Sequence, residues 1–230
     1  MVVAGGRGAR AGGDVPKQYR PIGGVPMVLR ALRPFVAHPD VAHVVLVVPP
    51  EDTAQPPAFL TGLAGAMLTI VAGGAERRDS VRAGLDAINP ACTAVLVHDA
   101  ARPFVGRAVI DAVIGQVRGG VSAIAAVPVS DTLKEASATD PQRIARTVPR
   151  DGLWRAHTPQ GFPRAVLERA HAAGHLTTAQ ATDDAALVEA LGEPVTLVPD
   201  SPRNFKVTTA DDFTLAELLA SRPELLEPAR

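Results

Sequence analysis

VAHVVLVVP, residues 41–49, is a continuous and largely β-branched run. Such a run is typical of a strand that is buried on both faces of a parallel sheet. The segments around it alternate in type. Strands are expected at 1–4, 66–74, 93–104 and 121–129, and helices at 26–37, 80–88 and 106–117. This alternation predicts an α/β fold: a doubly wound, mostly parallel sheet covered by helices on both faces.

The composition fits a single domain over residues 1–230, with 47% hydrophobic residues for one core. A net charge of -1 gives no broad basic field for nucleic acid. The apolar runs are strand-sized, so no membrane segment is expected. The single cysteine, Cys92, excludes an internal disulfide and a cysteine-rich metal site, and it favours a reducing cytoplasm.

The alternation stops after Val129. Two short β-like pieces, 131–135 and 143–148, flank a polar turn at 137–142, which predicts a projecting hairpin, or β-arm, at about 131–158. Helices are expected again at 162–174, 183–192 and 210–222. Strand-like pieces are expected at 194–199 and 204–208.

The stretch AGGRGARAGGDVPKQY, residues 4–19, follows the first strand. Its spacing Gly6-x-Gly8-x-x-Ala11 matches the dinucleotide fingerprint, which needs a helix to begin inside the motif. Further glycines and prolines make a helix before Pro26 unfavourable, and the acidic residue expected about 20 positions on is missing. A nicotinamide-dependent oxidoreductase is therefore disfavoured. A phosphate loop of the G-K-[ST] type is absent as well.

What remains is a long glycine-rich loop at the carboxyl edge of the sheet, carrying Arg10 and Lys17. Open backbone N–H groups and two cations suit a nucleoside triphosphate. The alternative interpretation is a flexible turn with solvated charges, because short glycine motifs also arise by chance.

Two further segments end strands on the same edge. In HDAARPF, 98–104, Asp99 could bind Mg²⁺ or a ribose hydroxyl, or could instead cap the next helix. That helix is expected near Gly106, which leaves Asp99 and Arg102 available. In GGAERRDSV, 73–81, Ser80 is favoured as a helix N-cap, beside a glycine pair at the strand end.

Two other features are weaker. In NFKVTT, 204–209, Lys206 is expected on the face opposite Phe205 and Val207, where simple solvation is the usual outcome. His171 and His175 have the spacing of a metal pair on a helix. They lack a third ligand nearby, so no metal site is predicted there.

Together, these segments resemble the 2-C-methyl-D-erythritol 4-phosphate cytidylyltransferase family of the non-mevalonate isoprenoid pathway. The resemblance runs from Ala4 to about Leu219 and is specific because the motifs occur in order and at the right spacing. The motifs are AGGRGAR (4–10), PKQY (16–19), GGAERRDSV (73–81), HDAARPF (98–104), DTLK (131–134), TVPRDGLWRAHTPQGF (147–162), TDDAALVEALG (182–192) and NFKVT (204–208).

The resemblance implies a Rossmann-like nucleotidyltransferase fold and a homodimer formed through the β-arm. It implies a reaction of CTP with methylerythritol phosphate, with Mg²⁺ as cofactor. The substrate phosphate attacks the α-phosphate of CTP in line and pyrophosphate leaves. No general base is needed, because a phosphate monoester is already an anion, so catalysis is positioning and charge stabilisation.

The resemblance also assigns roles to residues. Arg10 and Lys17 match the pair that stabilises the transition state. The nucleotide-binding positions are Ala4, Gly5, Gly6, Gly8, Gly74, Ala75, Ser80, Asp99 and Ala100, and Asp99 is also the metal position. The second substrate is bound by Arg102, Thr182 and Lys206 of one subunit and by Thr132, Arg150 and Thr158 reached from the partner's arm.

The chain departs from the family pattern in two places: the strand before the glycine loop is a stub, and position 75 is Ala, so only its backbone can contribute. Two alternatives stay open beside the family reading. Ribitol 5-phosphate cytidylyltransferases have similar loops but tend to carry Val where this chain has Ala101. A nucleotide-binding module without catalysis is disfavoured, because Arg10, Lys17, Asp99 and Lys206 are all present.

Overall fold

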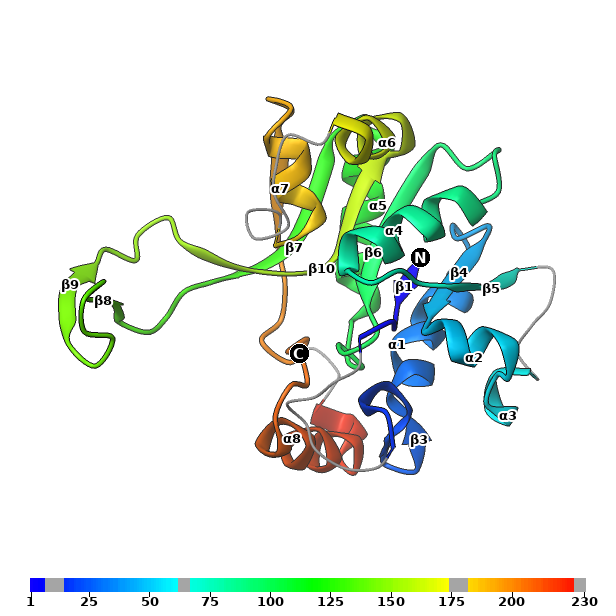
Figure 1. The fold of residues 1–230 in the computed structure, drawn as a ribbon, viewed down its shortest axis with the longest axis horizontal. Helices are drawn as coiled ribbons and strands as arrows, with labels where there is room; N and C mark the ends of the chain where they lie inside the picture. The colour runs from blue at the N-terminus through cyan, green and yellow to red at the C-terminus, as the bar shows by residue number, and fades with distance from the viewer. Residues whose placement is uncertain (7–14, 62–66, 174–181, 226–230) are drawn as a thin grey trace.

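The computed structural model describes residues 1–6, 15–61, 67–173 and 182–225. A seven-stranded sheet forms the centre, in the order β11-β7-β10-β6-β1-β4-β5 (Figure 1). Every neighbouring pair is parallel except the two that involve β10, which is antiparallel to both β6 and β7. The predicted fold class is confirmed. The strands are β1 (Val2–Val3), β4 (Val44–Val48), β5 (Leu68–Ala72), β6 (Ala94–Asp99), β7 (Ser122–Pro128), β10 (Trp154–Pro163) and β11 (Val195–Pro199).

Helices cover both faces of the sheet, because strand β4 has apolar side chains on both of its faces. Val44, Leu46 and Val48 point into one core, which contains α1 (Met27–Val36) and α5 (Arg107–Arg118). Val45 and Val47 point into the opposite core, with α4 (Arg77–Ala87), α6 (Arg164–Ala173) and α7 (Asp184–Glu189). Since side chains alternate along a strand, one continuous apolar run supports both layers.

Helix α5 lies very close to β10 at Gly161. A Cβ atom built there would lie 2.5 Å from Val113 Cγ1 and 2.8 Å from Val117 Cγ2. Only glycine allows this approach, so the position of α5 over the centre of the sheet depends on that residue.

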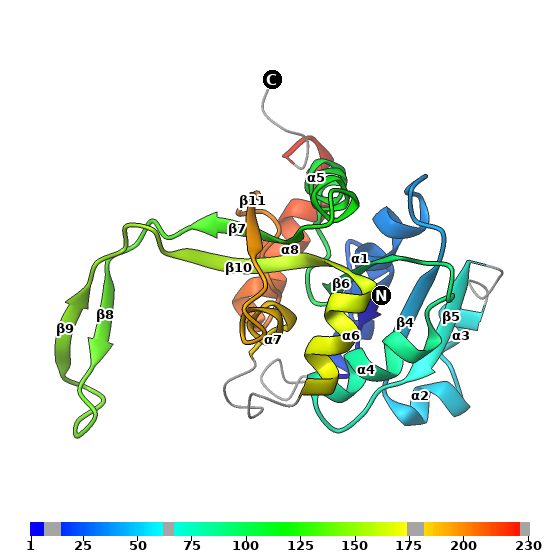
Figure 2. The same ribbon diagram turned by 90° about the horizontal axis from the view of Figure 1, so that it is seen from above.

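The β-arm consists of β8 (Leu133–Ala136) and β9 (Ile144–Val148), an antiparallel pair. It forms a sheet of its own and projects far from the body in both ribbon views (Figures 1 and 2). The sequence prediction extended the arm to residue 158. Here the structure corrects it, because Trp154–Pro163 returns into the body as the central strand β10.

Smaller elements line the carboxyl edge of the sheet. Helix α8 (Ala210–Ala220) packs Phe213 and Ala216 against Ile22, Met27 and Val207. The expected strand at 204–208 does not form. Its backbone is held by separate bonds to the body, among them one from Val207 N–H to the Ala101 carbonyl at 2.8 Å. The remaining elements are η2 (Lys17–Tyr19), β2 (Pro21–Ile22), β3 (Val25–Pro26), α2 (Pro50–Ala54), α3 (Ala58–Thr61) and η3 (Pro223–Leu225).

Within these described ranges, no helix is both long and apolar enough to cross a bilayer.

Candidate active site

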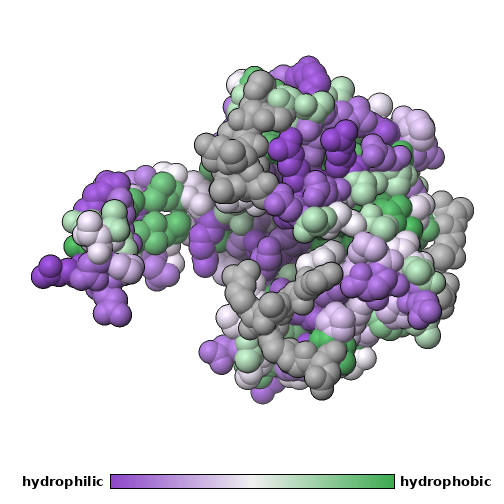
Figure 3. All heavy atoms as spheres, in the orientation of Figure 1, coloured by the Kyte–Doolittle hydropathy of each residue, from purple (hydrophilic) through white to green (hydrophobic). Residues whose placement is uncertain are grey.

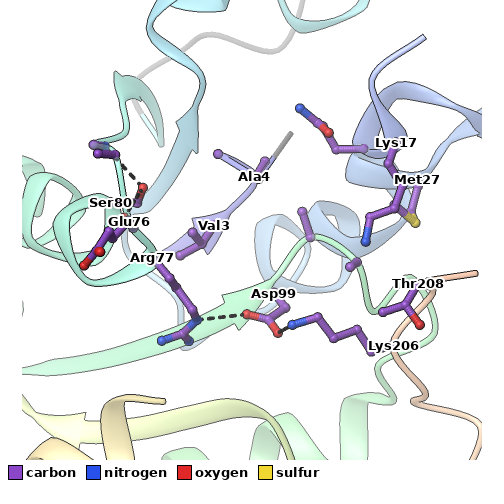
Figure 4. A pocket seen from close by; sticks show the side chains of 17 residues that line it. Val3, Ala4, Lys17, Met27, Glu76, Arg77, Ser80, Asp99, Lys206 and Thr208 are labelled. Atoms are coloured by element: carbon purple, nitrogen blue, oxygen red, sulfur yellow. Dashed lines mark hydrogen bonds and ion pairs between the residues drawn. The ribbon is translucent and has the colours of Figure 1, made fainter. Parts of the chain in front are cut away.

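The site lies where the strand order reverses. From β1 the chain builds outward through β4 to β5, and then returns to place β6 on the other side of β1. Ligands of open α/β sheets bind outside the carboxyl ends of strands at such a point. Ala4 follows β1 and Asp99 ends β6, and both line a cavity of about 490 Å³ at this place (Figure 4).

One wall of this cavity is built from backbone and small side chains. Gly5 and Gly6 follow β1, and Gly74 and Ala75 follow β5. Ser80 Oγ accepts a hydrogen bond from Gly74 N–H at 3.2 Å and donates one to the Glu76 carbonyl at 3.1 Å. A Cβ at Gly74 would lie 2.2 Å from Asp79 Cβ, so this turn requires glycine.

Ser80 is not the helix N-cap that the sequence favoured. Helix α4 begins at Arg77, three residues earlier, and its N-cap is Glu76. Glu76 and Asp79 form a capping box, in which Glu76 N–H donates to Asp79 Oδ2 at 3.1 Å. Ser80 therefore lies inside the first turn, where its hydroxyl holds the glycine turn beside the cavity.

Lys17 enters the cavity from the opposite side. It lies on η2, and its Nζ donates a hydrogen bond to the Val207 carbonyl at 2.8 Å. Figure 4 shows its side chain extending toward the centre of the cavity. Arg10 and Gly8 lie outside the described residues.

Asp99 lies between two cations. Its Oδ2 is 2.8 Å from Lys206 Nζ, and its Oδ1 is 3.4 Å from Arg77 Nε (Figure 4). Burial alone would raise the pKa of this carboxyl, but the charges of Arg77 and Lys206 outweigh it and hold the pKa well below its usual range. Asp99 is therefore ionised at neutral pH.

A second cavity of about 200 Å³ adjoins the first, and Arg77, Asp99 and Lys206 line both. Arg102 lines it from a buried position. Its Nη1 donates to the Asn204 carbonyl at 2.7 Å and its Nη2 to the Ala156 carbonyl at 3.2 Å. Burial lowers the pKa of Arg102 from its usual value. Its buried Nε has no hydrogen-bond partner in the described protein.

His98 contacts two residues that line the second cavity, Thr158 and Arg102. Asp99 N–H donates to Thr158 Oγ1 at 3.0 Å, and the Thr158 hydroxyl lies 2.9 Å from His98 Nδ1. Because Thr158 accepts from Asp99, its own proton is available to Nδ1. His98 Nε2–H is then the donor to the Arg102 carbonyl at 3.1 Å. Burial lowers the pKa of His98 to about 4, which keeps the ring neutral.

Comparisons with known proteins assign this chain to a family. The family model for 2-C-methyl-D-erythritol 4-phosphate cytidylyltransferase matches residues 1–222. The chain belongs to this family. The protein of that name from Salinibacter ruber is 44% identical over 220 residues, covering 95% of this chain and 91% of the relative. One from Frankia casuarinae is 44% identical, covering 100% of this chain and 84% of the relative.

A solved structure supports the same assignment. The crystal structure of 2-C-methyl-D-erythritol 4-phosphate cytidylyltransferase from Thermus thermophilus superposes with a TM-score of 0.76 at 36% identity. The superposition covers 96% of this chain and 98% of that chain. The resemblance that the sequence motifs carried is therefore confirmed at the level of family and fold.

Most positions assigned from the cytidylyltransferase family come together in one chain. The first cavity gathers the described nucleotide positions, namely Ala4, Gly5, Gly6, Gly74, Ala75, Ser80, Asp99 and Ala100. The second gathers Arg102, Thr158, Thr182 and Lys206. The two sets meet at Asp99 and Lys206, where the two reactants of a cytidylyltransferase have to meet.

The three positions assigned to a partner's arm do not lie together in the structure. Thr132 and Arg150 are exposed at the base of the arm, and Arg150 donates a hydrogen bond to the Ser130 carbonyl. Thr158 is 4% exposed and bonded inside this chain's own site. Its expected place on the arm was wrong, because β10 carries it back into the central sheet.

Sequence reasoning missed three residues of the site. They are Arg77, Asp184 and Gln160. Arg77 bridges Asp99 and the buried Asp184. Gln160 lies in the wall of the second cavity and donates to Asp183 Oδ2 at 2.7 Å. All three stand inside motifs that match the cytidylyltransferase family. A charged residue in a glycine-rich strand end and a buried Asp at a helix start were the available signals.

Proposed function

We propose that this chain joins CTP and 2-C-methyl-D-erythritol 4-phosphate, giving 4-diphosphocytidyl-2-C-methyl-D-erythritol and pyrophosphate. The names of its relatives point to this reaction. The observation that carries the proposal is the pair of adjoining cavities that share Arg77, Asp99 and Lys206. One cavity is lined by glycine turns and suits a nucleotide. The other holds a buried arginine and suits the phosphate of a second substrate.

The chemistry requires positioning and charge stabilisation. An oxygen of the methylerythritol phosphate forms a bond to the α-phosphorus of CTP, and the bond from that phosphorus to the bridging oxygen of the β-phosphate breaks. Pyrophosphate leaves with the bonding electrons. The attacking phosphate is already anionic, so no side chain has to remove a proton. Lys17, together with Arg10, is placed to offset charge that develops on the α-phosphate.

The electrostatics of the first cavity favour a polyphosphate. Its described lining has three cationic side chains, Lys17, Arg77 and Lys206, and two anionic ones, Glu76 and Asp99, which leaves one net positive charge. Positive clefts with low-dielectric walls concentrate anionic substrates. The glycine turn held by Ser80 offers backbone groups to the base, where shape and hydrogen bonding select cytosine.

Mg²⁺ fits this site as a companion of the nucleotide. Among the described residues, no three His, Cys, Asp or Glu side chains gather as a metal cage. Mg²⁺ is commonly held by one or two carboxylates together with substrate phosphates, and the ionised Asp99 supplies one such carboxylate. Bound there, the ion would neutralise triphosphate charge. Asp99 already has two cations beside it, so the phosphates of CTP are needed to attract the metal.

A homodimer formed through the β-arm is part of the proposal. An isolated two-stranded hairpin is marginally stable in water. This one carries apolar surface (Figure 3), and its Ile144 side chain is 64% exposed. Packing against a second copy would cover that surface. It would also bring Arg150 and Thr132, at the base of the arm, toward the second cavity of the partner, where an arginine binds phosphate well.

The proposal is tested by pyrophosphate release with purified protein and Mg²⁺. CTP paired with methylerythritol 4-phosphate is expected to release pyrophosphate, and ATP, GTP and UTP are expected to fail with the same acceptor. Ribitol 5-phosphate is the matched control acceptor, since the family match does not favour it. Preference for ribitol 5-phosphate would retain the cytidylyl chemistry and overturn the assigned substrate. No release with any pair would overturn the enzymatic function.

A further inference from the structure

Arg77 connects the site to a buried pair of side chains that the proposed reaction does not use. Its guanidinium divides its hydrogen bonds between two carboxylates, with Nη1 at 2.7 Å from Asp184 Oδ2 and Nε at 3.4 Å from Asp99 Oδ1. Figure 4 shows the Arg77 side chain pointing toward Asp99. An arginine that served only to neutralise Asp184 would be free to direct both donors to that one carboxylate.

Asp184 is anchored in turn by His171. The Asp184 side chain is 1% exposed and begins helix α7, and its Oδ1 lies 3.0 Å from His171 Nε2 on helix α6. Burial tends to raise the pKa of Asp184, but His171 and Arg77 together lower it, so the carboxylate stays charged. His171 is also buried, at 5% exposure. The row of contacts therefore runs from α6 through α7 and α4 to Asp99 at the end of β6.

We propose that His171 and Asp184 are positioning residues for Arg77, and through it for Asp99, the carboxylate that meets the Mg²⁺–nucleotide complex. The inference rests on the proposed function for the choice of ligand. A long arginine side chain loses much rotamer freedom when it is fixed. Asp184, itself held by His171, fixes this one from behind, so that its Nε faces Asp99 before any ligand binds. At metal sites, mutation of such outer contacts typically costs about 10- to 100-fold in affinity or activity.

The experiment is a double-mutant cycle on binding. The dissociation constant for Mg²⁺–CTP is measured by calorimetry on the full chain carrying His171→Leu, Arg77→Met or both. His171→Leu is expected to weaken binding on the order of 10-fold. If His171 acts through Arg77, the same change in the Arg77→Met background adds little. Additive effects would overturn the proposal, because they would show two independent structural losses.

A conservative variant separates positioning from packing. In His171→Gln the amide nitrogen can replace Nε2–H as the donor to Asp184, so affinity for Mg²⁺–CTP is expected to return to within about twofold of the wild type. Equal loss in the Leu and Gln variants would contradict the relay. If His171→Leu does not fold, Asp184→Asn replaces it in the double-mutant cycle with Arg77→Met. This variant keeps an acceptor for Arg77 without the charge. Melting temperatures identify that case.

The failure of this inference is distinct from the failure of the proposed function. If wild-type protein does not bind Mg²⁺–CTP, the function is wrong and the relay has no ligand to position. If wild-type protein binds Mg²⁺–CTP and the cycle is additive, the function stands and only the relay is wrong.

Discussion

Lys206 Nζ lies 2.8 Å from Asp99 Oδ2, although the two residues are 107 positions apart in the chain. Asp99 is the last residue of β6, and Lys206 comes from the irregular segment that crosses the carboxyl edge of the sheet. The pair stands where both cavities meet. Lys206 is 44% exposed and Asp99 13%, so the ammonium is accessible to a ligand while the carboxylate is largely covered.

Lys206→Met is expected to impair the reaction mainly through the second substrate. Loss of the ammonium removes a charge that faces the incoming phosphate, so kcat/KM for methylerythritol phosphate should fall on the order of 10²-fold. Affinity for CTP should change much less. Steady-state kinetics with each substrate varied in turn measures both effects. Lys206→Arg is the matched control and should retain part of the activity, whereas equal loss toward both substrates would contradict the assigned role.

Lys17→Ala is expected to act on the chemical step itself. Its ammonium faces the triphosphate cavity, so kcat should fall by a factor on the order of 10²–10³ with a smaller change in the KM for CTP. The same result is expected for Arg10→Ala from the family resemblance. Single-turnover measurements with both substrates saturating would show the effect. Near-wild-type turnover in both variants would remove the glycine loop from the mechanism.

A mixed dimer tests whether each site is shared between two subunits. Subunits carrying Arg150→Ala are combined with subunits carrying Lys206→Ala. If the arm reaches across, each heterodimer has one intact site and one doubly altered site. A random mixture should then recover roughly a quarter of wild-type activity, since about half of its dimers are mixed. Differently tagged subunits allow the heterodimers to be isolated. An inactive, folded heterodimer would mean that both residues serve the same subunit's site.

Protonation of His98 is expected to lower the free energy of unfolding in mild acid. Burial lowers the pKa of its imidazole from 6.5 to about 4, so the folded chain binds its proton later than the unfolded chain does. The stabilisation is complete above pH 6.5 and is lost as the pH falls toward 4. It amounts to on the order of 3 kcal/mol between pH 7 and pH 4. Urea unfolding at several pH values measures it.

The control for this titration is His98→Gln. The variant should be less stable at pH 7, because the bonds to Thr158 and Arg102 are altered, but its stability should depend less on pH between 6.5 and 4.5. The carboxylate of Asp99 titrates below this window, so it does not mask the difference. Identical slopes for the two proteins would show that His98 is not the titrating group.

The parts of the fold that were predictable from sequence are those where periodicity is strong. The β-branched run at 44–48 indicated a doubly covered strand, and the alternation around it indicated the parallel layers. The central antiparallel strand β10 escaped prediction. Its buried stretch contains His157, Thr158 and Gln160 beside Pro159, and such residues usually indicate a loop. Specific partners make their burial possible, among them Asp200 for His157 and Asp183 for Gln160.

Some residues of the site were likewise predictable from sequence, and others were not. Asp99 and the glycine turns could be assigned from sequence, because they end strands on a common edge. The pairing of Lys206 with Asp99 could not, since the lysine stands in a segment without regular structure. His171 was set aside as half of a metal pair, and its actual partner, Asp184, lies on another helix. Contacts between side chains of separate elements depend on tertiary geometry that local patterns do not encode.

The transfer of a cytidylyl group to the acceptor phosphate is tested most directly by following ¹⁸O. Methylerythritol 4-phosphate labelled at its non-bridging phosphate oxygens is incubated with CTP, Mg²⁺ and the protein, and the products are resolved by ³¹P nuclear magnetic resonance. In-line attack on the α-phosphate predicts that all of the label stays in the diphosphate product, including its bridging oxygen, and that pyrophosphate contains none. Label in pyrophosphate, or turnover without a labelled diphosphate bridge, would contradict the proposed reaction.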